Sequence, residues 1–192
     1  MSELARRFTS RRSDMAPGAS RMGIASIECW PAAGGGLLVG LADPMLAGDA
    51  PLRAPIKTVF LRLDGNGEIR CILPYVTVDA EPSACIRALI AEELAVSEGS
   101  VTVDDAASSY GIVDLHPSVE HNLQVLAAAT RALLIAAAAD NWQIPALACE
   151  VQGGKVRSSG RAASYREIAV DAALAAVPRT LQLRCGRPVD IA

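Results

Sequence analysis

The chain has 192 residues, of which 51% are hydrophobic and 4% aromatic, and its formal net charge is −3. This length suffices for one domain of ordinary size, whose core must be built from Ala, Leu, Val and Ile because aromatic side chains are so few. A general nucleic-acid-binding protein needs a basic face, so the slightly acidic balance argues against nucleic acid as a partner.

The beginning of the chain differs in composition from the rest. We expect residues 1–55 to form an extended arm or a decayed twin-arginine-like signal, because they are rich in Arg, Ser, Gly, Ala and Pro without sustained periodicity. An arginine pair ending at Arg12 precedes a short apolar run, residues 32–42, which is the plan of a twin-arginine export signal. Ser13 and Asp14 interrupt that plan, and the run is too short to span a bilayer. The arginines could instead form a membrane-surface arm or a clamp on a partner, and we favour the clamp.

Residues 56–178 are predicted to form the folded domain, which begins with a β-hairpin. The stretch "IKTVFLRLDGNGEIRCILP" (56–74) has alternating apolar residues on both sides of a turn at residues 64–67. Gly and Asn in that turn tolerate the positive φ that tight hairpins require. The alternation places the apolar residues of each strand on one face of a sheet.

Two helices with a short strand between them are expected next. Pro82 suits the first position of a helix whose apolar stripe runs from Cys85 to Leu94, with Glu92 and Glu93 on a solvated face. A short strand at residues 100–103 follows. The second helix covers roughly 119–140, and its last two turns are alanine-rich nearly all round, which predicts burial on several sides.

The last part of the chain is predicted to form a β-hairpin, a third helix and a tail. Gly153-Gly154 turns the hairpin, and Ser164 and Glu167 have the spacing of a capping box. The third helix must end before Pro178. Residues 179–192 are predicted to be an extended tail. The fold class is therefore α/β (α+β): a two-layer sandwich with a mixed sheet and about three helices on one face, preceded by the extended arm.

Candidate metal ligands and catalytic motifs are sparse. We expect zinc and iron–sulfur sites built by this chain alone to be absent, because no two of its five cysteines form a C-x-x-C pair. We interpret the cysteines mainly as small buried side chains. His116 and His121 are assigned to surface or capping roles, because a helix beginning at residue 117 or 118 leaves His116 outside it. G-x-S-x-G, P-loop and dinucleotide fingerprints do not occur in the sequence.

Several segments, taken in order, resemble a known family. They are "FLRLDGNGEIRCILP", "ALIAEELAV", "SVTV", "AAATRALLIAAAADNWQIPALACEVQGGKV" and "SGRAASYREIA". They look like the N-terminal region of large subunits in the xanthine oxidase family of molybdenum hydroxylases, of the isoquinoline 1-oxidoreductase beta subunit and periplasmic aldehyde dehydrogenase type. The resemblance covers about residues 56–190 and implies a molybdopterin-binding-type α/β domain. The ending "LRCGRPVDIA" is similar to the family's link into its next domain.

The family's cofactor motif is altered in this chain. In the family, a Glu-Met-Gly-Gln-Gly turn between a strand and a helix packs against the pterin dinucleotide, and its glycines let backbone N–H groups approach the phosphates. Gapless alignment of residues 74–94 puts the motif on Thr77, Val78, Asp79, Ala80 and Glu81. All five positions differ, and both glycines are acids. Like charges about 4 Å apart cost about 1 kcal/mol in water and more where water is excluded. We therefore expect this turn to bind no cofactor and to face a partner or water instead.

A second family element is also altered. The Gly/Ser-rich loop before the long helix should fall near residues 110–122, where this chain is shorter and lacks the glycines. Two phosphate-binding elements are thus missing together, which favours a chain that contributes packing.

The resemblance implies a non-catalytic subunit or domain of a molybdenum-cofactor-dependent aldehyde or N-heterocycle oxidoreductase complex. Its partners would be a molybdopterin-binding large subunit and a [2Fe–2S] small subunit, which would hold the cofactors. No residue of this chain is expected to be catalytic or to bind a metal. The alternatives are an independent scaffold or protein-binding module, and a chain that completes the dinucleotide pocket with backbone groups. A homo-oligomer is expected if partners are absent. The chain would be periplasmic if exported with its partner and otherwise cytoplasmic.

Overall fold

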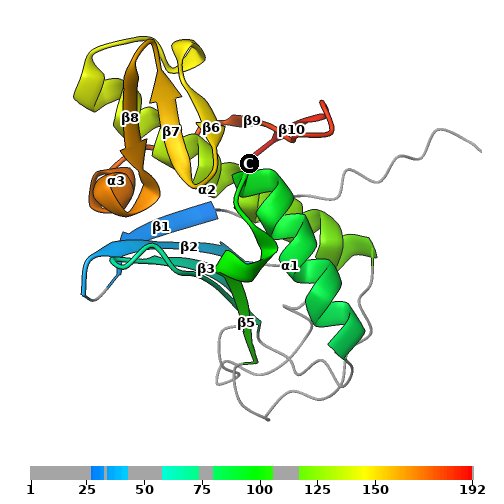
Figure 1. Ribbon diagram of the computed structural model, residues 1–192. Coiled ribbons are helices and arrows are strands. Elements are labelled where there is room, and N and C mark those ends of the chain that lie inside the picture. Colours follow the sequence, from blue (N-terminus) through cyan, green and yellow to red (C-terminus); the bar gives the residue numbers. More distant parts are fainter. Residues whose placement is uncertain (1–26, 33, 43–57, 74–79, 106–116, 192) are drawn as a thin grey trace, which may run out of the picture.

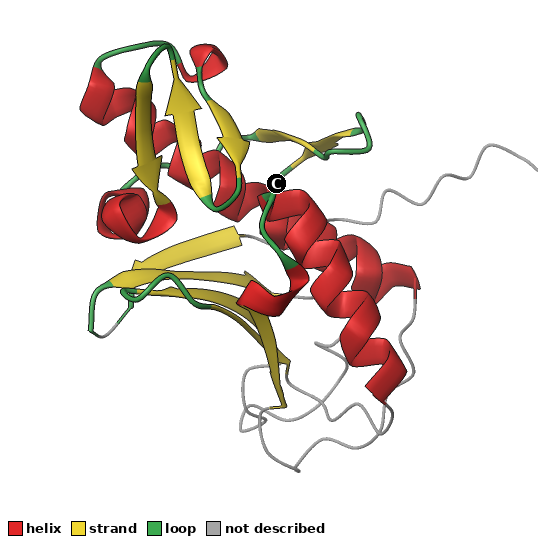
Figure 2. Cartoon of the chain, in the orientation of Figure 1, coloured by secondary structure: helices red, strands yellow, loops and turns green. Residues whose placement is uncertain are grey.

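The computed structural model describes residues 27–32, 34–42, 58–73, 80–105 and 117–191. Within these ranges the chain forms a five-stranded mixed sheet, three α-helices and two small sheets (Figures 1 and 2). The predicted mixed α/β class with three helices is confirmed.

The main sheet has the strand order β1-β2-β3-β4-β5. The pairs β1–β2, β2–β3 and β3–β4 are antiparallel, whereas β5 runs parallel to β4. Since parallel neighbours need a crossover, helix α1 makes the connection between β4 and β5. The strands are β1 (Ile27–Pro31), β2 (Gly36–Ala42), β3 (Thr58–Asp64), β4 (Ile69–Leu73) and β5 (Val101–Asp105).

Strands β1 and β2 contradict the expectation that residues 27–42 belong to an extended arm. Leu37 and Val39 of β2 are completely buried, and β2 lies between β1 and β3. The strand was missed because its residues are apolar or Gly on both faces, which hides the period of two. Gly36 supports this placement, since it has φ of 143° and a Cβ there would lie 2.2 Å from the carbonyl oxygen of Leu63.

One face of the sheet packs against helices. Helices α2 and α3 contact β2 and β3, and α1 packs along α2; Figure 1 shows α3 above β1 and β2, and α1 beside β5. The predicted alternation is confirmed, because Leu61 and Leu63 of β3 and Ile69, Cys71 and Leu73 of β4 are all buried. The helices are α1 (Ala80–Leu94), α2 (Pro117–Trp142) and α3 (Tyr165–Ala172), and 3-10 turns occupy Glu98–Ser100 and Ala146–Ala148.

Helix α2 is the central helix of the core. Residues Glu120–Trp142 are long and apolar enough to cross a membrane by length and composition alone, with a mean hydropathy of 1.5. However, 67% of that window is buried inside the fold, as in the core helix of a globular domain. Ala137, Ala138 and Ala139 are buried at consecutive positions, so this part of the helix contacts neighbours on several sides, as predicted.

Two small sheets complete the fold. The hairpin turn at Gly153-Gly154 is confirmed, with φ of 56° and 71°. The predicted extended tail instead forms a hairpin that turns through Gly186, and its Leu181 and Leu183 are buried. Strand β8 was not predicted. The strands are β6 (Glu150–Gln152), β7 (Lys155–Ser158) and β8 (Arg161–Ser164) in one sheet and β9 (Thr180–Gln182) and β10 (Pro188–Asp190) in the other.

The capping box at the start of α3 is present as predicted. Oε2 of Glu167 accepts hydrogen bonds from the backbone N–H of Ser164 at 2.6 Å and from its hydroxyl at 2.7 Å. The side-chain bond and then the backbone bond from Ser164 lower the pKa of Glu167, because both favour the ionised carboxylate. The capping box therefore fixes the first turn of α3 by local chemistry.

Candidate functional site

The turn predicted to have lost its cofactor lies mostly outside the described residues. Thr77, Val78 and Asp79 fall there, whereas Ala80 and Glu81 stand in the first turn of α1. An acid in the first turn of a helix complements the partial positive charge of the helix N-terminus. The placement of the Glu81 side chain lies outside what the structure describes. That the turn binds no cofactor remains a prediction.

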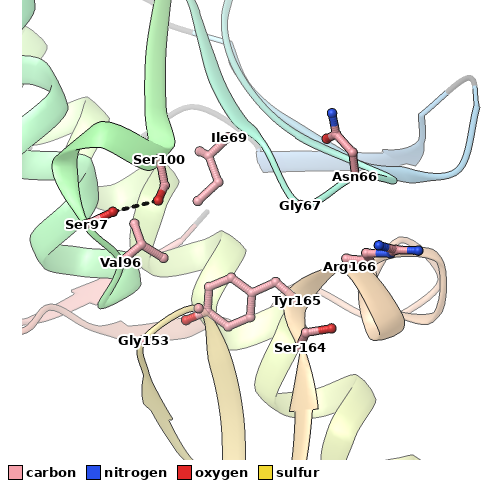
Figure 3. Close-up of a pocket in the computed structure, with 11 residues that line it drawn as sticks. Asn66, Gly67, Ile69, Val96, Ser97, Ser100, Gly153, Ser164, Tyr165 and Arg166 are labelled. Atoms are coloured by element: carbon pink, nitrogen blue, oxygen red, sulfur yellow. Dashed lines mark hydrogen bonds between the residues drawn. The ribbon is translucent and has the colours of Figure 1, made fainter.

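A pocket of about 490 Å³ lies between the β3–β4 turn, the segment that follows α1, the β6–β7 turn and the start of α3. Figure 3 shows Ser97, Ser100 and Val96 on one side of it and Arg166 on the opposite side, with Tyr165 and Ser164 between them. The pocket was not foreseen, because its walls come from four segments far apart in the sequence. Its lining consists of Asn66, Gly67, Ile69, Val96, Ser97, Ser100, Gly153, Gly154, Ser164, Tyr165 and Arg166.

Hydrogen bonds hold the walls of this pocket together. The N–H of Gly154 donates to the carbonyl of Ala95 at 3.2 Å, and the N–H of Tyr165 donates to the carbonyl of Gly154 at 3.0 Å. The Tyr165 hydroxyl donates to the carbonyl of Leu94. Burial raises the pKa of Tyr165 to about 12, so its phenol stays neutral. The β6–β7 turn, the end of α1 and the start of α3 are therefore joined as one unit.

The polar side chains of the pocket bond mainly to the protein itself. The Ser97 and Ser100 hydroxyls lie 2.7 Å apart, and Oδ1 of Asn66 accepts from the N–H of Glu68 at 2.9 Å. Ser164 is engaged in the capping box. Arg166 is exposed. A nucleophile needs an adjacent base, and the lining residues bring no such pair together. The pocket has room for a small polar group.

Metal ligands are not gathered within the described ranges. No group of three or more His, Cys, Asp or Glu there could hold a metal ion. His121 lies half-buried in α2, and His116 falls outside the described residues.

Of the five cysteines, one is buried, two are half-buried and two are exposed. Burial raises the pKa of Cys71 to about 12 and also raises the pKa of Cys29 and Cys149, so these thiols are held neutral. The prediction of a buried side chain is confirmed for Cys71 and is wrong for Cys85 and Cys185, which are exposed. The error at Cys85 has a simple cause: the buried side of α1 begins at the next residue and continues through Ile90 and Leu94.

Glu93 forms a buried ion pair with Arg131, which the sequence analysis missed. The sequence predicts that Glu92 and Glu93 both face solvent; Glu92 is exposed, but Glu93 is only 3% exposed. Nη1 of Arg131 donates to Oε2 of Glu93 at 2.6 Å and to its carbonyl oxygen at 2.9 Å. A buried charge is tolerated only with partners such as these, so Glu93 is a structural residue.

The same carboxylate binds the C-terminal segment. The backbone N–H of Arg184 donates to Oε1 of Glu93 at 2.9 Å, and Nε of Arg184 donates to the Glu93 carbonyl at 3.3 Å. Nη2 of Arg131 donates to the carbonyl of Gln182, and Nη2 of Arg184 to that of Val151. Glu93 thus joins α1, α2 and the β9–β10 hairpin at one point.

The face of the main sheet opposite the core helices is called the outer face here. It is made of two rows of paired residues, in which each residue lies beside its partner on the next strand. The rows are Trp30, Leu38, Arg62, Arg70 and Thr102, and Glu28, Gly40, Phe60, Ile72 and Asp104.

Two aromatic rings cover a glycine on the outer face. The ring centroids of Trp30 and Phe60 lie 6.4 Å apart, and a Cβ on Gly40 would meet both rings at 3.0 Å. Trp30 remains 39% exposed. These are two of the chain's seven Phe, Trp and Tyr residues. An exposed Trp beside a half-buried Phe on a sheet face is typical of a surface that binds protein.

Charges stand beside the aromatic pair. Arg62 pairs with Asp64 at 2.5 Å, and Arg70 lies 3.1 Å from Asp64, 3.0 Å from Glu68 and 3.6 Å from Asp104. Asp64 and Glu68 lie next to these rows, at the β3–β4 turn. Together with Glu28 and Asp104 they give the described part of the outer face four carboxylates against the two guanidinium groups of Arg62 and Arg70, a net charge of −2.

Comparison with known proteins gives structural matches only. No protein-family model matches the chain, and no curated protein does. The chain is similar to quinoline 2-oxidoreductase from Pseudomonas putida 86, with 15% identity and a TM-score of 0.47, over 59% of this chain and 16% of that one. It is also similar to Cu,Mo-CO dehydrogenase in its carbon monoxide reduced state, with 16% identity and a TM-score of 0.46, over 57% of this chain and 15% of that one. The chain thus spans only a small part of the length of either.

Proposed function

We propose that this chain is a non-catalytic subunit or domain of a molybdenum-cofactor-dependent aldehyde or N-heterocycle oxidoreductase complex, in which it packs against the cofactor-binding large subunit. The observation that carries the proposal is the sequence of residues 77–81. They stand where the family it resembles has its cofactor motif, with acids at both glycine positions. Each added Cβ blocks close approach, and each carboxylate opposes a phosphate.

In this proposal the chemistry belongs to the partners. The resemblance implies that the large subunit inserts oxygen from water at an aldehyde carbon or an electron-poor ring carbon. Electrons leave through the [2Fe–2S] subunit. This chain contributes packing and an interface, and holds neither cofactor.

Two features of the described residues support a packing role. Glu93 and Arg131 use buried charge to fasten the C-terminal hairpin rather than to face a substrate. The hydroxyls of Ser97 and Ser100 bond to each other rather than pointing as a pair at a ligand. These polar groups form hydrogen bonds and ion pairs within the chain itself, as expected of a structural partner.

The alternative is an independent scaffold or protein-binding module derived from the same domain. The exposed Trp30 beside Phe60 favours this reading as well, because a binding surface serves either role. The two differ in what the partner is.

Native purification separates these functions. The chain, tagged in its source organism at its natural level, is purified and analysed by mass spectrometry and elemental analysis. The proposal predicts a molybdopterin-binding large subunit in stoichiometric amount, together with molybdenum and iron. Recovery of the chain with other proteins and without molybdenum would favour the scaffold. Recovery of the chain alone would contradict both.

A further inference from the structure

We propose that the outer face of the main sheet is a docking site for the chain's own arginine-rich N-terminal segment, residues 1–26. This inference does not depend on the proposed oxidoreductase partner.

The outer face is negatively charged, so it favours the binding of a basic segment. Four carboxylates and two guanidinium groups leave it at −2, so two copies of this face repel each other. Residues 1–26 carry five arginines, no lysine, and only Glu3 and Asp14 as acids. Their net charge of +3 from these side chains is opposite in sign to that of the outer face. The arginines are Arg6, Arg7, Arg11, Arg12 and Arg21.

The aromatic pair favours arginine among the cations. A guanidinium group is planar and weakly hydrated, so it stacks on aromatic rings while its N–H groups bind carboxylates. Trp30 of β1 offers an exposed indole, and Asp64 lies on the same face of the sheet, on β3, with β2 between the two strands. Arg62 and Asp64 already show a guanidinium–carboxylate contact there, at 2.5 Å.

The attachment point makes the contact possible. Residue 26 directly precedes Ile27, the first residue of β1, and β1 itself carries Glu28 and Trp30 on the outer face. At about 3.3 Å per residue, 26 residues reach about 86 Å, far more than the roughly 19 Å across five strands. Covalent attachment keeps the local concentration of the segment high, which favours its binding over that of a free partner.

Photo-crosslinking in the full chain tests the proposal. A benzophenone amino acid replaces Ser10, between the arginines, and crosslinks are mapped by mass spectrometry at low salt. We expect them on the outer face, at residues 28–30, 38–40 and 60–64. The yield should fall several-fold at about 1 M salt, where the Debye length is about 3 Å. Crosslinks spread over the molecule, or centred on the helices, would overturn the proposal.

Charge variants make the test specific. Replacement of the five arginines (Arg6→Ser, Arg7→Ser, Arg11→Ser, Arg12→Ser, Arg21→Ser) should lower the outer-face yield as far as high salt does. Asp64→Asn with Asp104→Asn should lower it as well. The matched control is Asp140→Asn, an exposed acid at the end of α2, which should leave the yield unchanged. Equal yields in all of these chains would contradict an electrostatic docking site.

Isotope mixing identifies the source of the segment. Equal amounts of ¹⁴N and ¹⁵N chains are crosslinked together. Docking within one chain gives crosslinked peptide pairs of a single isotope. Mixed pairs at the outer face would show that a second copy supplies the segment, and would overturn the assignment to the same chain.

Discussion

At the scale of single residues, Glu93 shows how a buried charge determines the architecture. Its two carboxylate oxygens and its carbonyl oxygen bind Arg131 and Arg184, from a second helix and from the C-terminal segment. Glu92, the next residue, is exposed and makes none of these contacts. Sequence alone could not distinguish the two, because Arg131 and Arg184 reach Glu93 only in the folded chain.

Replacing Glu93 by alanine should therefore destabilise the protein strongly. Removal of one member of a buried pair leaves Arg131 without its counter-charge, which costs about 3–5 kcal/mol in the free energy of unfolding. Urea unfolding followed by circular dichroism measures this difference. The matched control is Glu92→Ala, which should change the stability by less than about 0.5 kcal/mol. Equal losses in the two variants would contradict the role of Glu93.

At the scale of elements, local chemistry could be predicted from the sequence and long-range packing could not. The Gly67 and Gly154 turns and the Ser164–Glu167 capping box involve neighbours within a few residues, and all three are present. Strand β2 was missed, because "AAGGGLLVGLA" is equally consistent with a signal-like apolar run. Its pairing with β1 and β3 in the folded chain shows it to be a strand.

The pocket could not be predicted from the sequence for the same reason. Its walls come from residues near 66, 97, 153 and 165, and no local pattern links them. The turn at residues 77–81 is the opposite case. Its acids are evident from the sequence, and its cofactor role was interpreted only through resemblance to a family.

Gly36 gives a direct test of β2 as a core strand. Alanine there would place its Cβ 2.2 Å from the Leu63 carbonyl oxygen, at a φ of 143° that side chains rarely adopt. We expect Gly36→Ala to lower the free energy of unfolding by about 1–3 kcal/mol. Gly99→Ala serves as the control, because a Cβ there meets nothing within 4 Å. A Gly36→Ala protein as stable as the Gly99→Ala protein would argue against the pairing of β2 with β3.

At the scale of the whole molecule, the two faces of the main sheet have different roles. One face packs Leu37, Leu61 and Ile69 against the helices and supplies the stability of the fold. The outer face keeps Trp30 exposed and has a net negative charge, which makes it available for a polypeptide partner. In our proposal, recognition belongs to the face opposite to the one that packs the core.

The central claim is that this chain accompanies a molybdenum cofactor without binding it. The most direct test is an electron cryo-microscopy map of the native assembly purified through this chain. The account predicts that the chain packs against the cofactor-binding subunit and that the pterin dinucleotide has no hydrogen bond to residues 77–83. A cofactor phosphate within hydrogen-bond distance of those residues, or an assembly that lacks a molybdenum subunit, would contradict it.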